Sequence, residues 1–200
     1  EAAREINTVI FDKTGTLTEG SFGVVGIETV NGIKTEDALV LTAAVEGDSE
    51  HTIAQGIRRS AQQKGLELPV VQDFEAIKGR GIHTKMNGHD VYVGGPRLLE
   101  MLNVTLPESL STFDQAASAK GQSVVHLVKD GMLLASLALA DVIRPESHEA
   151  IQRLHEMGVQ VAMLTGDSQA VAKTVAGELG IDTYFAEVLP ENKDQKVNEL

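Results

Sequence analysis

The chain has 200 residues, enough for one large domain or two small ones. Its formal net charge of −12 argues against a nucleic-acid-binding protein, and the lack of cysteine excludes disulfide bonds and thiolate metal sites. Hydrophobic residues make up 42% of the chain, so a core of normal size is expected. No stretch approaches the roughly 20 apolar residues that a membrane-spanning helix needs.

The first predicted element is a short strand. Residues 8–11 are apolar or β-branched and lead directly into Asp12, which is followed by the polar loop 13–16. This pattern predicts a buried parallel strand with a catalytic loop at its carboxyl end.

The middle of the chain has a different pattern, with alternating apolar and polar residues and three Asn-Gly or Asp-Gly pairs that are typical of hairpin turns. It predicts an antiparallel α+β unit. The expected strands cover 23–30, 81–86, 90–93, 123–128 and 132–140, and the expected helices cover 35–46, 52–64, 96–101 and 108–120.

The last third alternates helices and strands. The expected order is a helix over 148–157, a strand over 159–164, a helix to 179 capped by residue 167 or 168, a strand over 183–188 and a helix from 190. Such alternation predicts a doubly wound parallel sheet. We therefore expect two domains, one of residues 1–20 and 141–200 and one inserted at 21–140. Because the last residues predict a helix without a stop signal, we expect the chain to be part of a longer protein.

Asp12 begins the seven-residue string Asp-Lys-Thr-Gly-Thr-Leu-Thr. A carboxylate held at the end of a strand can act as a nucleophile toward phosphorus. Gly15 lets backbone N–H groups approach a phosphate, while Lys13 and the hydroxyls of Thr14 and Thr16 add charge and donors. An isolated aspartate would more often lie in a solvated turn, but this combination favours phosphoryl chemistry.

The string resembles the phosphorylation motif of P-type ATPases, a branch of the haloacid dehalogenase-like superfamily. The resemblance covers the whole chain and implies a phosphorylation domain with a haloacid dehalogenase-like sheet and an inserted nucleotide-binding domain. It implies that Asp12 forms an aspartyl phosphate with ATP, and that its carboxylate and the Thr14 main-chain carbonyl bind Mg²⁺. Related phosphatases carry a second aspartate where this chain has Thr14, which cannot act as a general acid or base. The phosphoenzyme is therefore expected to persist.

The resemblance also assigns roles around the phosphoryl group. It implies that Thr165 donates to the transferred group, that Gly166 allows close approach and that Asp167 helps near the nucleotide. Lys193 resembles the family's phosphate-pairing lysine. Asp141 resembles a hinge residue near the nucleotide ribose.

A nucleotide site is expected in the inserted domain. The segment Ser-Glu-His-Thr, with Glu50 and His51, resembles an adenine-binding motif of heavy-metal-transporting P-type ATPases, although Thr52 stands where proline is usual. The same subgroup implies nucleotide contacts at Gly79 and Gly81, and at Gly94 in a segment where Gly95 replaces asparagine. The remaining histidines show no ligand spacing and are not expected to bind metal.

The function expected from these motifs is the ATP-binding catalytic part of a cation pump, with copper as the first choice of ion. The resemblance implies transmembrane helices, an actuator domain and the ion site elsewhere in the protein, and a location on the cytoplasmic face of a membrane. ATP and ADP are the expected ligands of this part. Two alternatives stay open, a soluble phosphatase of the same superfamily and a non-enzymatic nucleotide-sensing module.

Overall fold

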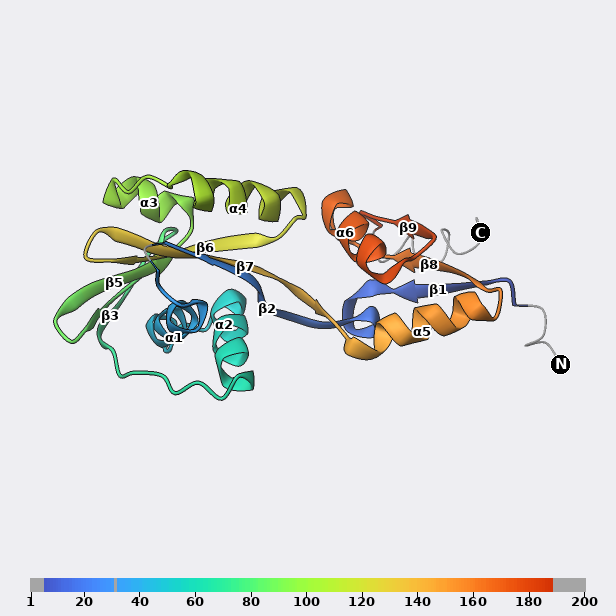
Figure 1. Cartoon of the computed structure of the whole chain (residues 1–200), viewed down its shortest axis with the longest axis horizontal. Coiled ribbons are helices and arrows are strands. Elements are labelled where there is room, and N and C mark those ends of the chain that lie inside the picture. Colours follow the sequence, from blue (N-terminus) through green and yellow to red (C-terminus); the bar gives the residue numbers. More distant parts are fainter. Residues whose placement is uncertain (1–5, 31, 189–200) are drawn as a thin grey trace. The chain divides into compact units, whose positions relative to one another are not determined.

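A computed structural model describes residues 6–30 and 32–188 (Figure 1). The chain divides into two compact units. The inserted unit is Phe22–Ala140, and the first unit is built from the segments before and after it. Each unit has its own hydrophobic core.

The first unit contains a parallel sheet of three described strands. β1 (Thr8–Asp12) and β9 (Thr183–Phe185) flank the central β8 (Gln160–Leu164), and both pair with it in parallel. Two helices follow the βαβ pattern, α5 (Pro145–Glu156) before β8 and α6 (Gln169–Leu179) after it. An α/β fold with a parallel sheet is thus confirmed.

The sequence explains where these helices begin and end. Pro145 occupies the first turn of α5, where its missing N–H is not needed. Ser168 caps α6 by accepting a hydrogen bond from the Val171 N–H at 3.4 Å, and Gly180 ends it in a left-handed conformation. Ile151 of α5 packs with α6 and with one face of β8 in a single core.

The strands of this unit differ from the prediction in two respects. β1 is half-buried rather than buried, because it lies at the edge of the described sheet. β9 ends at Phe185, three residues earlier than predicted. The helix predicted from residue 190 lies outside the described residues.

The inserted unit is built on a six-stranded sheet with the order β2-β7-β6-β5-β4-β3. The pairings from β3 through β7 are antiparallel, as predicted. The strands are β2 (Thr18–Thr29), β3 (Gln72–Ile77), β4 (Gly81–Met86), β5 (His89–Gly94), β6 (Ser123–Lys129) and β7 (Met132–Ile143).

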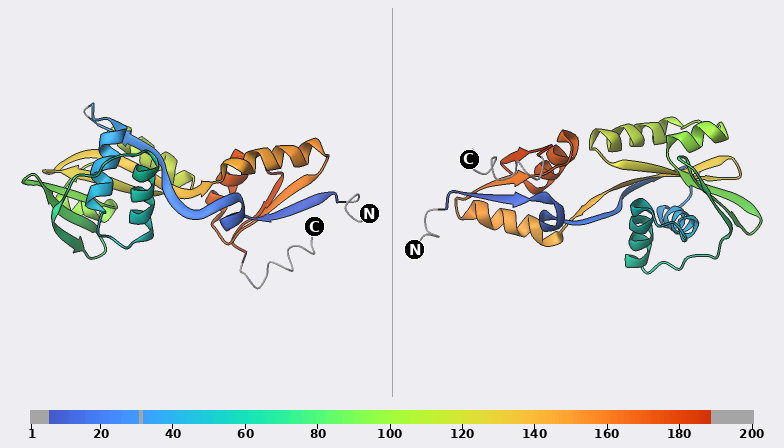
Figure 2. Two further views of the ribbon diagram at one scale, coloured as in Figure 1. Left: turned by 90° about the horizontal axis from the view of Figure 1, so that it is seen from below. Right: turned by 180° about the vertical axis from the view of Figure 1, so that it is seen from behind.

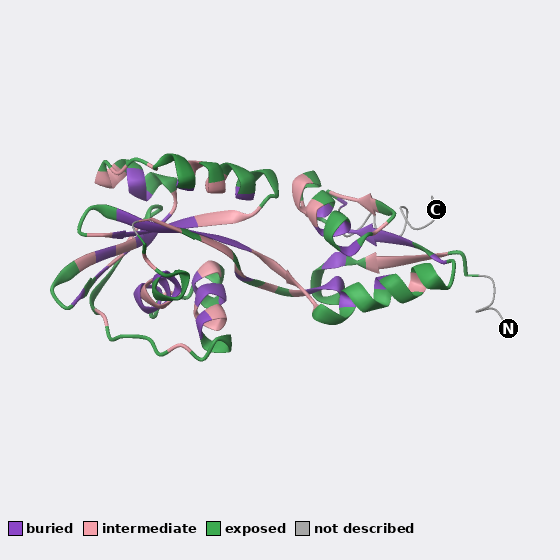
Figure 3. Cartoon of the chain, in the orientation of Figure 1, coloured by how far each residue is buried: buried purple, intermediate pink, exposed green. Residues whose placement is uncertain are grey.

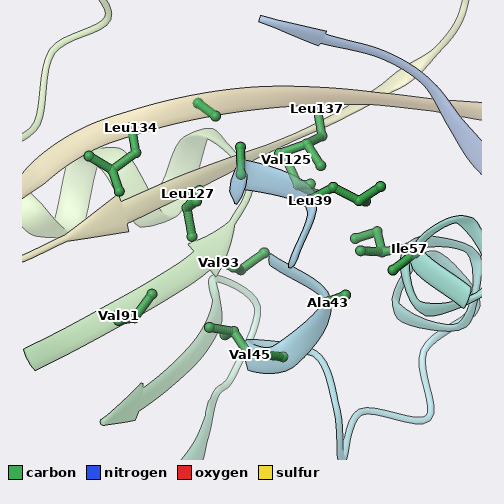
Figure 4. Close-up of a cluster of buried hydrophobic side chains, with 14 of the residues drawn as sticks. Leu39, Ala43, Val45, Ile57, Val91, Val93, Val125, Leu127, Leu134 and Leu137 are labelled. Carbon is green, nitrogen blue, oxygen red and sulfur yellow. The ribbon is translucent and has the colours of Figure 1, made fainter. Parts of the chain in front are cut away.

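Helices cover both faces of this sheet (Figures 1 and 2). α1 (Thr35–Val45) and α2 (Thr52–Gln63) pack on one face, and α3 (Pro96–Leu102) and α4 (Glu108–Ala119) on the other. The larger core lies under α1 and α2, where Leu39 and Ile57 meet apolar residues of β4 to β7 (Figure 4). Burial is concentrated in the central strands (Figure 3).

Two strands carry the chain between the units. β2 runs from Thr18 to Thr29 and β7 from Met132 to Ile143, so each crosses a unit boundary without a break. The domain limits expected after residue 20 and after residue 140 thus fall within continuous strands. Among the described residues, no helix is long and apolar enough to cross a membrane.

Candidate active site and nucleotide pocket

Asp12 lies at the carboxyl end of β1, beside the end of β8. The register pairs Asp12 with Leu164, so the loops that follow both residues emerge at the same edge of the sheet. Asp12 is exposed to solvent, which suits a nucleophile that must meet a ligand. This edge is where open α/β sheets bind ligands.

The turn Lys13–Leu17 follows Asp12 and is held by α5. Gly15 has φ = 78°, a conformation that favours glycine. The Arg144 guanidinium donates to the carbonyl oxygens of Thr18 at 3.1 Å and Gly15 at 3.4 Å. Ser147 donates its hydroxyl to the Leu17 carbonyl at 2.9 Å. These bonds fix the backbone that presents the expected phosphate-binding N–H groups.

Lys13 is buried rather than directed into solvent. Its side chain is only 3% exposed, and its ammonium lies 2.9 Å from Asp141 Oδ2 and 2.8 Å from Asp167 Oδ2. Burial opposes the charge, but hydrogen bonds to Asp167 and Asp141 outweigh it and raise the pKa of Lys13. The sequence suggested a lysine facing the phosphate, whereas the structure gives its ammonium two carboxylate partners.

Thr165 and Asp167 form a closed turn after β8. The buried Thr165 hydroxyl donates to Asp167 Oδ2 at 2.8 Å and accepts from the Asp167 N–H at 3.1 Å. Although partial burial opposes ionisation, the hydrogen bonds from Lys13 and Thr165 lower the pKa of Asp167. A Cβ on Gly166 would lie 3.5 Å from the Val188 carbonyl oxygen, an ordinary van der Waals contact, so packing within this turn does not itself require glycine.

Asp141 uses both of its carboxylate oxygens within the first unit. Oδ2 accepts from Lys13 and, at 2.6 Å, from the Thr18 hydroxyl, while Oδ1 accepts from the Ser21 N–H at 3.1 Å. Its contact with a nucleotide ribose stays a prediction. Lys193 lies outside the described residues.

A second candidate site lies wholly in the inserted unit. A cavity of about 810 Å³ opens between the loop before α2, the β3–β4 turn and the β5–α3 junction. This volume is within the range of small-molecule sites. Four residues that the sequence predicted line it, namely His51, Gly79, Gly81 and Gly94.

Glu46 lines this cavity, and the sequence prediction missed it. The prediction named Glu50, which is exposed and is not among the lining residues. Glu46 is 7% exposed, and burial raises its pKa to about 7, against the opposing effects of a Ser49 hydrogen bond and the Arg58 charge. Its position directly after the apolar run Ala43–Val45 was the available signal.

Arg58 of α2 holds the loop that carries these residues. Its guanidinium donates to the carbonyl oxygens of Glu46 and, at 2.8 Å, of Ser49. His51 caps α2, because its Nδ1 accepts from the Ile53 N–H at 3.3 Å. Thr52 therefore begins the helix although proline is absent, and the His51 ring is fixed at the cavity wall.

Two glycines allow the backbones of β4 and β5 to approach each other closely. A Cβ on Gly81 would lie 2.2 Å from the Val93 carbonyl oxygen, and one on Gly94 would lie 2.2 Å from the Arg80 carbonyl oxygen. No real Cβ atom tolerates such distances. The structure therefore requires glycine at both positions for packing, independently of any ligand.

The donor set near Asp12 fits Mg²⁺ better than a transition metal. Among residues 6–30 and 32–188, no group of three or more His, Cys, Asp or Glu is arranged to hold a metal. Mg²⁺ is usually held by one or two carboxylates together with substrate phosphates and water. The Asp12 carboxylate and the Thr14 carbonyl are oxygen donors of this kind.

Comparison with known proteins identifies the family. The model of haloacid dehalogenase-like hydrolases matches residues 6–200, and the chain belongs to this family. The chain is 45% identical to copper-exporting P-type ATPase B of Archaeoglobus fulgidus over 201 residues, which is 100% of this chain and 28% of that protein. It thus spans about a quarter of the length of such relatives.

Two solved structures extend this similarity. A zinc-transporting PIB-type ATPase in the E2.Pi state superposes with a TM-score of 0.81 at 34% identity, over 97% of this chain and 32% of that chain. The catalytic domain of the CPx-ATPase CopB-B, studied for its conformational changes upon nucleotide binding, gives a TM-score of 0.55 at 27% identity. That match covers 98% of this chain and 67% of the other.

Proposed function

We propose that this chain is the ATP-handling part of a P-type cation-transporting ATPase, in which Asp12 accepts the γ-phosphoryl group of ATP. The observation that carries the proposal is the position of Asp12, exposed at the end of β1 beside the Thr165–Asp167 turn. The phosphorylation domain comprises residues 1–20 and 141–200, and the nucleotide-binding domain residues 21–140.

The reaction is an in-line displacement. An Asp12 carboxylate oxygen attacks the γ-phosphorus, the bond from that phosphorus to the bridging oxygen of ADP breaks, and ADP leaves with the bond's electron pair. Thr165 donates its hydroxyl to a transferred oxygen, and Lys193 neutralises charge there. Mg²⁺, when bound by Asp12 and the Thr14 carbonyl, offsets the repulsion between two anionic reactants.

The intermediate persists because of Thr14. A phosphatase that hydrolyses an aspartyl phosphate quickly needs a nearby group that can take a proton from water, and a threonine hydroxyl cannot do so at neutral pH. A long-lived phosphoenzyme is what a pump requires, because its conformational work follows phosphorylation.

The cavity of the inserted unit holds the nucleotide. His51 stacks on the adenine, Glu46 accepts from its exocyclic amine, and Gly79 and Gly81 let the backbone approach the ribose and phosphates. The largely apolar lining suits a flat aromatic base.

Copper is the transported ion that we propose. Support comes from the similarity to copper-exporting P-type ATPases, although a similar solved structure is that of a zinc-transporting ATPase. The transmembrane helices that bind the ion and the actuator domain that dephosphorylates Asp12 belong to the rest of the pump. The part described here lies on the cytoplasmic face.

The test is to trap the intermediate. The full-length pump is incubated with ATP labelled at the γ-phosphorus, denatured in acid and treated with hydroxylamine, which cleaves acyl phosphates. We expect hydroxylamine-sensitive label in the native protein and none in Asp12→Asn. Label that persists in this variant would remove Asp12 from the mechanism.

The same preparation separates the alternatives. A soluble phosphatase would turn over p-nitrophenyl phosphate rapidly without a trapped intermediate. A nucleotide-sensing module would bind ATP and incorporate no label. Either result would replace the pump as the proposed function.

A further inference from the structure

The position of Lys13 is unusual for a residue beside a phosphate-binding loop. Its side chain is 3% exposed, and its ammonium group lies within 2.9 Å of two carboxylates from distant parts of the chain. Two of the three N–H donors of this ammonium are used by these carboxylates, and the burial of the side chain restricts the approach of a phosphoryl oxygen to the third. Geometry therefore argues against direct contact with the transferred group.

Each carboxylate partner is bonded onward to a functional part of the first unit. Asp167 accepts the Thr165 hydroxyl through the same oxygen, Oδ2, that pairs with Lys13. Asp141 lies in β7 and also accepts from the Thr18 hydroxyl and the Ser21 N–H of β2. The two strands that connect the units are thus joined to each other and to Lys13, the residue next to Asp12.

We infer that Lys13 is a positioning residue, not a phosphoryl ligand, and that it fixes the Asp12 loop relative to the Thr165–Asp167 turn and the two connecting strands. The inference rests on the proposed function, because it concerns the geometry in which Asp12 meets the phosphoryl group. Removing the ammonium leaves two partly buried carboxylates without their counter-charge, so we expect the turn and the strands to lose their fixed position relative to the Asp12 loop.

The ion-pair network makes a prediction that a phosphate ligand would not make. Asp141 has both oxygens occupied by Lys13, Thr18 and Ser21, so we expect it to influence phosphorylation through these contacts. Substitutions at Lys13 and Asp141 must then be non-additive, because both remove the same contact. A lysine that touched the phosphate would act independently of Asp141.

The experiment measures acyl-phosphate formation at saturating ATP, together with ATP affinity, in the full-length pump. We expect Lys13→Met to slow formation by about 10- to 100-fold while ATP affinity changes by less than about twofold. We expect Lys13→Met/Asp141→Asn to be no slower than Lys13→Met alone. Lys173→Met removes an exposed lysine of α6 and is the matched control, with no expected change.

A second variant guards against a Lys13 substitution that fails to fold. Thr18→Val keeps every charge and nearly the same shape, but it removes the 2.6 Å hydrogen bond to Asp141. We expect it to slow phosphorylation by about three- to tenfold without loss of ATP affinity. A phosphate-ligand lysine would leave the rate of Thr18→Val unchanged.

Two outcomes overturn the inference. One is a double variant whose defect equals the product of the single defects. The other is a native rate in both Lys13→Met and Thr18→Val. If instead the native protein forms no hydroxylamine-sensitive intermediate, the proposed function itself fails, and the two failures are thereby distinguished.

Discussion

At the residue scale, Glu46 is the less exposed of the two glutamates that line the cavity of the inserted unit. Its folded-state pKa of about 7 lies above the ordinary value of 4.5. A raised pKa in an acid favours the neutral form, so its contribution to stability is fully present below about pH 4.5 and is lost as pH rises through about 7.

Glu46→Gln removes this titration. Because glutamine stays neutral, we expect the melting temperature of the native protein to fall relative to the variant as pH rises through about 7. Thermal unfolding followed by circular dichroism over this pH range measures the difference. Glu50→Gln, at an exposed position, is the control, and an equal pH response in both variants would contradict the assignment.

The sequence could predict residues whose role depends on local neighbours. Asp12, Thr14 and the Thr165–Asp167 turn follow from short strings at strand ends. The environment of Lys13 could not be predicted, because its partner Asp141 is 128 residues away in sequence and comes close only when β7 returns to the first unit. Glu46 was missed for a related reason, since its burial depends on helices and strands that assemble around it.

At the element scale, the β4–β5 pair and the loop between α1 and α2 build the cavity walls. The close approach of β4 and β5 depends on the lack of a side chain at Gly94, and the position of the loop depends on the Arg58 side chain. A single substitution at either residue therefore tests one wall of the cavity.

Gly94→Ala tests the close approach of β4 and β5. Its Cβ would lie 2.2 Å from the Arg80 carbonyl oxygen, so the backbone must move, and we expect a loss of about 2 kcal/mol or more in unfolding free energy. The neighbouring Gly95→Ala meets nothing within 4 Å and is the control. Urea unfolding of both variants measures the difference in stability. Equal unfolding midpoints would show that the β4 and β5 backbones leave room for a side chain at position 94.

Arg58→Lys tests the support of the α1–α2 loop. Lysine keeps the charge but lacks the planar fork that donates to the Glu46 and Ser49 carbonyls. We expect nucleotide affinity to fall by about three- to tenfold, because the cavity wall loses its fixed position. Titration calorimetry with ATP measures the affinity of each variant, and Arg59→Lys, at the adjacent position, is the control. Unchanged affinity in Arg58→Lys would remove this support role.

Strand pairs were predicted correctly where an Asn-Gly or Asp-Gly pair marks the turn between them. The Asn87-Gly88 and Asp130-Gly131 pairs have positive φ at all four residues, as hairpin turns of this type require. β3 was missed because five of its six residues are exposed and a bulge interrupts its pairing with β4. An exposed strand lacks the alternation of apolar residues on which strand prediction depends. The positive φ at Asp73 is also atypical of a strand.

At the scale of the whole molecule, each unit has its own main hydrophobic core, and the inserted unit has a smaller second core on the α3 and α4 face of its sheet. Insertion at a strand pair places the cavity wholly within Phe22–Ala140, while Asp12 and the Thr165–Asp167 turn belong to the first unit. The sequence predicted this division because the alternation of strands and helices changes type at both ends of the insertion.

Separate cores predict separable unfolding. Ile151→Ala leaves a cavity in the core of the first unit, because this side chain is only 1% exposed. We expect the unfolding free energy of that unit to fall by about 2–5 kcal/mol. Ile57→Ala, at a fully buried site of the inserted unit, is the matched substitution. Hydrogen exchange should show increased opening only in the substituted unit, and ATP should protect the inserted unit in both variants. Exchange that rises equally throughout the chain in either variant would mean that β2 and β7, as continuous strands, unite the two cores into one cooperative unit.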